Sequence, residues 1–184
     1  MIIMANMRYE MQIQCDSREK KGELERIQGQ FDRLGVDYFV SKLYVGDYMN
    51  LDNPRLVIDR KKNLQELCGN ITQQHERFQR ELMRAKDKQI KMIILCEHGQ
   101  GIENLEDVFF WENPRRKDHA YRMVNGKPKW IYIPEPKRAT SGKQLYKSLN
   151  TIRTRYGVDF VFCEPEETGQ KIIDLLMTGT EHGL

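Results

Sequence analysis

The stretch that decides the fold is residues 45–48, Val-Gly-Asp-Tyr, read together with residues 57–61, Val-Ile-Asp-Arg-Lys. The residues between them include two asparagines, an aspartate and a proline, which favour turns. Runs rich in Val, Ile, Leu and Tyr on both sides of such residues are typical of a β-hairpin with a longer loop. The sequence therefore predicts paired strands at Tyr38 to Tyr48 and at Leu56 to Lys61, joined by a loop over Met49 to Leu56.

Three charged side chains of this hairpin are expected to meet at one spot. Side chains alternate faces along a strand, so Asp59 and Lys61 share one face and Arg60 lies on the other. Asp47, near the loop end of the first strand, can face Asp59 across the pair. Two carboxylates and one ammonium group would then converge.

Such a constellation suits a hard divalent cation. Mg²⁺ in proteins commonly takes one or two carboxylates, together with waters and a phosphate. A neighbouring lysine can hold an attacking water and offset charge in a phosphoryl transition state. The alternative is that Asp47 and Asp59 are strand-end acids in surface ion pairs and that Lys61 is a solvated lysine. Opposed acids repel without a cation between them, which favours the metal interpretation.

With its flanking residues, this motif resembles the nuclease motif of the XPF/Hef-type structure-specific DNA endonucleases. Gly-Asp-Tyr at residues 46–48 and acid-Arg-Lys at residues 59–61 carry the resemblance. Upstream, Asp-Ser-Arg-Glu at residues 16–19 matches the end of the opening strand of that family, and Glu23 stands where the family has a further acid. The clear match covers about residues 12–97, and residues 156–176 fit more loosely.

The resemblance implies a restriction-endonuclease-like α/β core, with a mixed central β-sheet flanked by helices. It also implies a Mg²⁺- or Mn²⁺-dependent endodeoxyribonuclease that acts on branched or junction DNA in recombination or repair, and a homodimer formed through the nuclease domain. The implied catalytic residues are Lys61, Asp47, Asp59, Arg60, Asp16 and Glu23, of which Asp47, Asp59 and Asp16 are the implied metal ligands.

Several of these residues have simpler explanations. Asp16 could cap a helix, Glu23 could be an exposed helical acid, and Arg60 could pair with an acid. Asp59 stands where the family has glutamate, and Gln65 stands where it often has an acid. These two departures keep open a second function, that of a catalytically silent domain that binds DNA or dimerises. A third alternative, an α/β domain with no nucleic-acid role, would require the motif to be a coincidence, and it would be supported if Lys61 were buried in an ion pair away from any cleft.

Composition limits the class of protein. The 184 residues are 31% charged, with a net charge of +3 and a mean hydropathy of −0.71, and no apolar run is long enough to span a membrane. The amino-terminal residues lack the features of a signal peptide. We therefore expect a soluble, cytoplasmic protein, and we expect its four cysteines to be reduced and buried because they form no C-x-x-C pair.

Hydrophobic periodicity predicts alternating strands and helices and hence an α/β domain with a mixed sheet. We expect one domain, residues 1–184, with its core at about 11–100 and 141–177 and an insert at about 105–140. The predicted strands outside the hairpin are Met11 to Cys15, Ile90 to Cys96 and Val158 to Cys163. The predicted helices are Glu23 to Leu34, 63 to about 71, Glu76 to Lys86, Ser141 to Tyr156 and Thr168 to Leu176, with residues from Thr178 onward frayed.

Basic side chains supply the candidates for DNA contact. Arg77, Arg80 and Arg84 share one helix face, and together with Arg18 and Lys62 they are the predicted DNA-binding residues; a solvated helix face is the alternative. The insert interleaves basic and aromatic residues and contains Asn125-Gly126, a hairpin turn signal. That composition suits a DNA backbone groove with stacking platforms, or aromatic cover for the insert itself.

Overall fold

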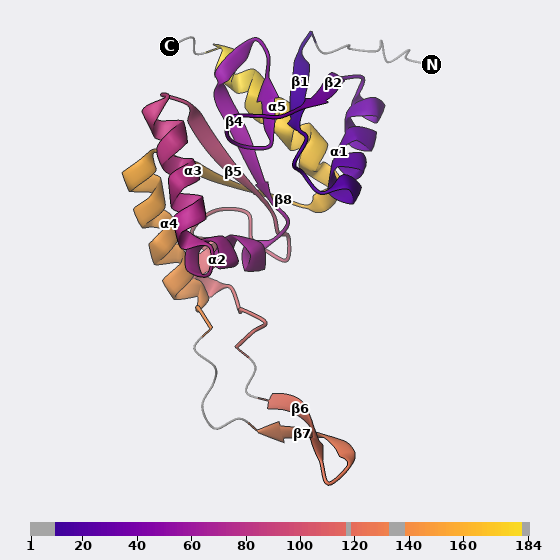
Figure 1. Cartoon of the computed structure of the whole chain (residues 1–184), viewed down its shortest axis with the longest axis vertical. Helices are drawn as coiled ribbons and strands as arrows, with labels where there is room; N and C mark the ends of the chain where they lie inside the picture. Colours follow the sequence, from indigo (N-terminus) through magenta and orange to yellow (C-terminus); the bar gives the residue numbers. More distant parts are fainter. Residues whose placement is uncertain (1–9, 117–118, 133–138, 182–184) are drawn as a thin grey trace.

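The molecule is built around one mixed sheet of six strands, in the order β2-β1-β3-β4-β5-β8 (Figure 1). The computed structural model describes residues 10–116, 119–132 and 139–181. The β1–β2, β4–β5 and β5–β8 pairs are parallel, whereas β3 runs antiparallel to both β1 and β4. The strands are β1 (Gln12–Asp16), β2 (Asp37–Ser41), β3 (Tyr48–Asn50), β4 (Asn53–Lys61), β5 (Lys91–Glu97) and β8 (Asp159–Cys163).

Helices cover both faces of this sheet. On one face lie α1 (Lys21–Leu34) and α5 (Thr168–Glu181), and on the other α2 (Leu64–Thr72), α3 (His75–Asp87) and α4 (Gly142–Tyr156) (Figure 1). Successive side chains of a strand point to opposite faces of the sheet, so they pack into two separate hydrophobic cores. Ile58 of β4 packs in the core under α1 and α5, and its neighbour Val57 packs in the core under the other three helices. The predicted α/β architecture is confirmed.

Local signals in the sequence set the helix ends. The side chain of Asn63 accepts a hydrogen bond from the backbone N–H of Glu66 at 2.9 Å, which begins α2. Ser141 and Gln144 form a capping box at the start of α4. Gly35, with φ +70°, ends α1 in the left-handed conformation. The closing helix α5 is longer than predicted, because residues from Thr178 onward continue it to Glu181.

The prediction of one strand over Tyr38 to Tyr48 is wrong. The run splits into β2, which pairs in parallel with β1, and β3, which pairs with β4. The loop predicted over Met49 to Leu56 is also wrong, because Asn50 pairs with Asn53 and only residues 51–52 lie between the strands. The register of the β3–β4 pair shifts between Met49 and Asn50, and the extra residues of β4 form a bulge there.

A separate two-stranded ribbon, β6 (His119–Val124) paired with β7 (Lys127–Tyr132), stands away from the body of the molecule in Figure 1. Its turn is the predicted Asn125-Gly126, with φ of +51° and +75°, as a type I′ hairpin requires. The remaining elements are the short 3₁₀ helices η1 (Asp107–Phe110) and η2 (Pro165–Glu167).

The four cysteines are free and buried, as expected. Among the described residues, no helix is both long and apolar enough to cross a membrane.

Candidate active site

One cleft, of about 860 Å³, gathers all of the predicted catalytic residues together with Arg18, Lys62 and the three arginines of α3. Its floor is formed by the end of β4 and the loop before β3, and its walls come from α1, α2 and α3. The residues singled out from the sequence that line it are Asp16, Arg18, Glu23, Asp47, Asp59, Arg60, Lys61, Lys62, Arg77, Arg80 and Arg84. Lys61 lies in this cleft, so the structure lacks the feature that would have supported the third alternative, a Lys61 buried away from any cleft.

Gly46 lets the backbone bring Asp47 against β4. Its φ is +73°, and an added Cβ would lie 3.1 Å from both the carbonyl oxygen of Ile58 and the Cβ of Val57, so glycine is required there. The N–H of Asp47 donates to the Ile58 carbonyl at 2.8 Å. Its carboxylate Oδ2 accepts from the backbone N–H of Arg60 at 2.7 Å. Tyr48 pairs with Ile58, so the same register sets Asp47 opposite Asp59.

Asp59 and Lys61 form a buried ion pair beside Asp47. They are only 3% and 8% exposed, and Lys61 Nζ lies 2.5 Å from Asp59 Oδ2. The ammonium of Lys61 is therefore the group that faces this oxygen. Burial raises the pKa of Asp59 above its usual value, and Glu81 adds to the rise, while Lys61 opposes it.

The carboxyl group of Asp47 is more strongly perturbed. Burial raises its pKa well above the usual value, and the negative charge of Asp59 raises it further. Burial alone would lower the pKa of Lys61, but Asp59 and Asp47 outweigh it and the pKa rises, so the ammonium stays charged. The Nζ of Lys61 also lies 5.7 Å from the ring centre of Phe78, which forms part of the cleft wall.

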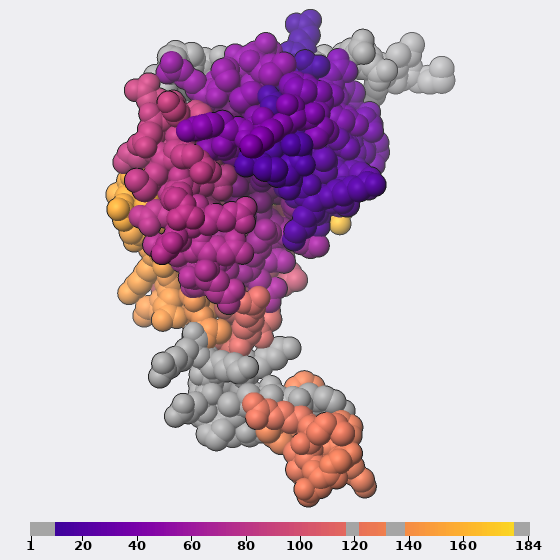
Figure 2. Space-filling view, in the orientation of Figure 1, coloured from indigo at the N-terminus to yellow at the C-terminus, as the bar shows by residue number. Residues whose placement is uncertain are grey.

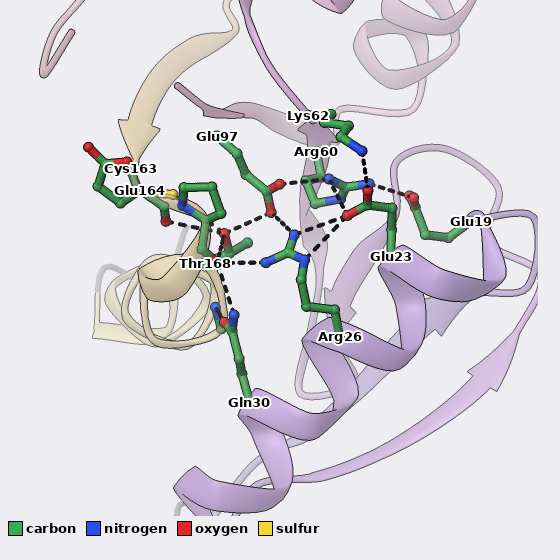
Figure 3. A network of polar contacts seen from close by, with 12 residues as sticks. Glu19, Glu23, Arg26, Gln30, Arg60, Lys62, Glu97, Cys163, Glu164 and Thr168 are labelled. Carbon is green, nitrogen blue, oxygen red and sulfur yellow. Dashed lines mark hydrogen bonds and ion pairs between the residues drawn. The ribbon is translucent and has the colours of Figure 1, made fainter. Parts of the chain in front are cut away.

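The opposite face of β4 carries a buried charge network, shown in Figure 3. Arg60 is 5% exposed and pairs with Glu19 at 2.7 Å and with Glu97 at 2.9 Å. Glu97 also accepts from Arg26 and from the hydroxyl of Thr168, which ties α1 and α5 to the sheet. Strand alternation thus separates Arg60 from Asp59 and Lys61, as predicted, and Arg60 has the acid partners that its simpler interpretation required.

Asp16 and Glu23 are each engaged by neighbouring groups. Asp16 Oδ1 accepts from the backbone N–H of Leu43 at 3.2 Å, and Oδ2 accepts from Arg18 at 2.7 Å. Glu23 pairs with Lys62 at 2.8 Å and with Arg26 at 3.2 Å. The hydrogen bond from Lys62 is the main reason that the pKa of Glu23 lies below its usual value. Both carboxylate oxygens of Asp16 already accept hydrogen bonds, so a cation would have to compete with these donors. A metal-binding role for Asp16 stays a prediction.

The three arginines of α3 are exposed along the cleft, and between them stands an acid that sequence reasoning missed. Glu81 lines the cleft, accepts from the N–H of Gly46 at 3.4 Å and raises the pKa of Asp59. Its only sequence signal is its spacing of four residues from Arg77 and three from Arg84, which places it on their face. Glu19, which pairs with Arg60, was also missed as a site residue.

Two carboxylates, those of Asp47 and Asp59, are available to a cation. No group of three or more His, Cys, Asp or Glu side chains suited to a metal occurs in the part of the chain that the structure describes. Mg²⁺ and Mn²⁺ do not require one, because substrate phosphate and water complete their coordination. The half-buried carboxylate of Asp47 and the carboxylate of Asp59 opposite it are hard oxygen ligands, and they therefore fit a hard divalent cation.

Comparison with known proteins identifies the family and the fold. A family model described as the ERCC4 domain matches residues 15–176. Among solved structures, the chain is similar to XPF from Aeropyrum pernix, with a TM-score of 0.58 and 17% identity over 93% of this chain and 66% of that chain. A second structure, the same archaeal XPF in complex with DNA, gives 0.59 and 18% over 95% and 67%. A search of curated proteins found no match.

At this identity the structural likeness concerns the fold, and the chain spans about two thirds of the archaeal protein's length in that structure. The matched residues run from the end of β1 to within α5. They include β3, β4 and the loop before β3, and hence both Asp47 and Asp59. The chain therefore belongs to the ERCC4 domain family and has the fold of an XPF-type nuclease domain.

Proposed function

We propose that this protein is a Mg²⁺- or Mn²⁺-dependent endonuclease that hydrolyses phosphodiester bonds in DNA. The observation that carries the proposal is the meeting of the buried Asp59 and Lys61 with the half-buried Asp47 at the floor of an arginine-lined cleft. Buried carboxylates with raised pKa values beside a charged lysine are costly unless they serve a site.

Each residue has a role that follows from its position. Asp47 and Asp59 would hold the cation, with Asp16 as a further candidate ligand. When bound, such a cation supplies Lewis acidity and a water of lowered pKa. Lys61, held as an ammonium, donates hydrogen bonds and offsets negative charge at the phosphate. Arg60 keeps Asp47 in place through its backbone N–H and braces β4 through its side chain.

The arginine wall is proposed to bind the DNA backbone. Arg77, Arg80 and Arg84 line the cleft and are exposed, so replacing all three with glutamine is expected to weaken DNA binding about tenfold or more. The slope of log Kd against log salt should fall by about 2 to 3, at roughly 0.9 for each lost phosphate contact. Anisotropy titrations in EDTA at several salt concentrations would measure both. An unchanged slope would remove these arginines from the interface.

A preference for branched or junction DNA, homodimer formation and a place in recombination or repair are further parts of the proposal. They rest on membership of the ERCC4 domain family, and light scattering with and without DNA would test the dimer.

The test of the function is cleavage of labelled fork, flap, four-way-junction and linear DNA with Mg²⁺, Mn²⁺ or EDTA. Wild type is compared with Asp59→Ala and Lys61→Ala. Cutting that needs a metal and is lost in both variants supports the proposal, and the ranking of substrates tests the preference for branches. DNA binding without cleavage under every metal condition would instead favour the alternative function, a catalytically silent domain. The presence of Asp59 in place of glutamate leaves that alternative open.

A further inference from the structure

The β6–β7 ribbon (residues 119–132) is not used by the cleft. It projects from the body of the molecule in the space-filling view (Figure 2), and the cleft lining does not include it. A two-stranded ribbon alone is marginally stable in water, so a partner that packs on it would help to order it. The question is what that partner is.

The ribbon carries a local excess of positive charge. Residues 119–132 contain three basic residues, Arg122, Lys127 and Lys129, and no aspartate or glutamate. The net charge of the whole chain is +3, so the rest of the chain is neutral in sum. The excess positive charge is therefore concentrated on the projecting element, as a polyanionic partner would require.

Strand register sorts the ribbon into two faces. Arg122 lies opposite Lys129, and Val124 lies opposite Lys127, so the basic side chains share one face. Met123 lies opposite Pro128 on the other face, which also carries Trp130. Met123 and Trp130 are 68% and 61% exposed. One face thus suits phosphates and the other suits sugars and base edges.

We propose that the β6–β7 ribbon is a DNA-binding arm that enters the major groove of duplex DNA outside the cleft. The major groove admits a two-stranded β-ribbon, whereas the narrower minor groove does not offer the same width. The basic face lies along the phosphate backbone, and Met123 and Trp130 contact groove edges. The inference rests on the proposed function in one respect, that DNA is the substrate, and it adds a second contact region to the arginine wall.

The test compares two triple variants of the full chain that lose equal charge. Arg122→Gln/Lys127→Gln/Lys129→Gln removes the basic face, and Arg33→Gln/Lys42→Gln/Lys88→Gln removes exposed basic side chains of the body. Anisotropy with a labelled blunt duplex, in EDTA, is expected to show a Kd raised about tenfold for the ribbon variant, with a salt slope lower by about 2 to 3. The control variant should stay within about twofold of wild type.

Equal weakening by both variants would overturn the assignment, because general charge would then explain binding. A larger loss for single-stranded than for duplex DNA would overturn the groove assignment. A change of oligomeric mass with an unchanged Kd would make the ribbon an interface between copies of the chain.

Tryptophan fluorescence supplies a second readout. The chain has two tryptophans, and Trp111 is only 8% exposed, so quenching by acrylamide reports mainly on Trp130. A saturating concentration of duplex DNA should protect Trp130 from acrylamide. Unchanged quenching would contradict the proposed contact between the apolar face of the ribbon and the DNA. Because every binding measurement is made in EDTA, it does not depend on cleavage. If the ribbon variant binds DNA more weakly but wild type cuts no DNA, only the proposed nuclease activity is refuted. If wild type cuts DNA but the ribbon variant binds as tightly as wild type, only the DNA-binding arm is refuted.

Discussion

Replacing Asp47 with asparagine is expected to lower the rate of DNA cleavage by about 100- to 1,000-fold. Asparagine keeps the size of the side chain and an oxygen that can accept the N–H of Arg60, so the loop before β3 should hold its shape. What disappears is the negative charge beside Asp59 and Lys61. Single-turnover cleavage under saturating enzyme would measure the chemical step, and DNA affinity in EDTA should stay within about twofold of wild type.

The same variant should make the metal-free protein more stable. The pKa of Asp47 is raised by folding, so the folded state holds its proton to higher pH than the unfolded state. Stability from this group is present below the unfolded pKa of about 4 and is lost as pH rises through the folded pKa. Asp47→Asn removes that loss, so at neutral pH in EDTA its Tm should exceed that of wild type, and at low pH the two should converge.

Asp52→Asn is the matched control, because Asp52 lies in the exposed turn of the same hairpin and outside the cleft. It should leave cleavage and Tm unchanged. Full cleavage by Asp47→Asn would remove Asp47 from the site. A lower Tm for Asp47→Asn in EDTA at neutral pH would mean that the charge of Asp47 is structural.

Replacing Arg60 with methionine is expected to destabilise the fold by about 3–5 kcal/mol, the usual result of breaking a buried charge pair. Arg60 is 5% exposed and sits between Glu19, Glu97 and the more distant Glu23. Glu97, 4% exposed, would keep Arg26 and Thr168 but lose the arginine that faces it. For a domain of this size the Tm should fall by about 10 °C, and urea unfolding would give the free energy directly.

The cause can be separated from lost packing by a double variant. Arg60→Met/Glu19→Gln also removes the charge of the carboxylate whose ion pair with Arg60 is lost, so it should recover part of the lost stability. Arg80→Met is the control, because its side chain is 64% exposed and its pair with Glu76 spans 3.7 Å; it should change stability by less than about 0.5 kcal/mol. An Arg60→Met variant as stable as wild type would contradict the structural role of the network.

Most elements could be predicted from short-range patterns. The apolar stripe of α1, the cap at Asn63 and the glycine at residue 35 are local signals, and the structure confirms them. Alternation along residues 57–61 placed Asp59 and Lys61 on one face and Arg60 on the other, which is also confirmed. These features depend on neighbours in sequence, so they can be recognised without the fold.

The errors concern partners distant in sequence. Residues 38–48 read as one strand because β-forming residues fill the run, yet β2 pairs with β1 and β3 pairs with β4. Gly46 marks the break through its positive φ, which a single sequence does not distinguish from a flexible glycine. Glu81 was missed for a similar reason, because only the packing of α3 over β4 brings it to the cleft. The ribbon turn at Asn125 was found because its signal is local.

The most direct test of the central claim is equilibrium binding of Mn²⁺, followed by electron paramagnetic resonance of the free ion, for wild type and Asp47→Asn. Wild type should bind Mn²⁺ without DNA, Mg²⁺ should compete, and affinity should rise with pH because the cation displaces protons from carboxyl groups with raised pKa values. Asp47→Asn should lose this binding, whereas Glu23→Gln should retain it, because Glu23 lies in α1 and faces Arg60 rather than Asp59 and Lys61. Identical Mn²⁺ binding by wild type and Asp47→Asn would contradict the account.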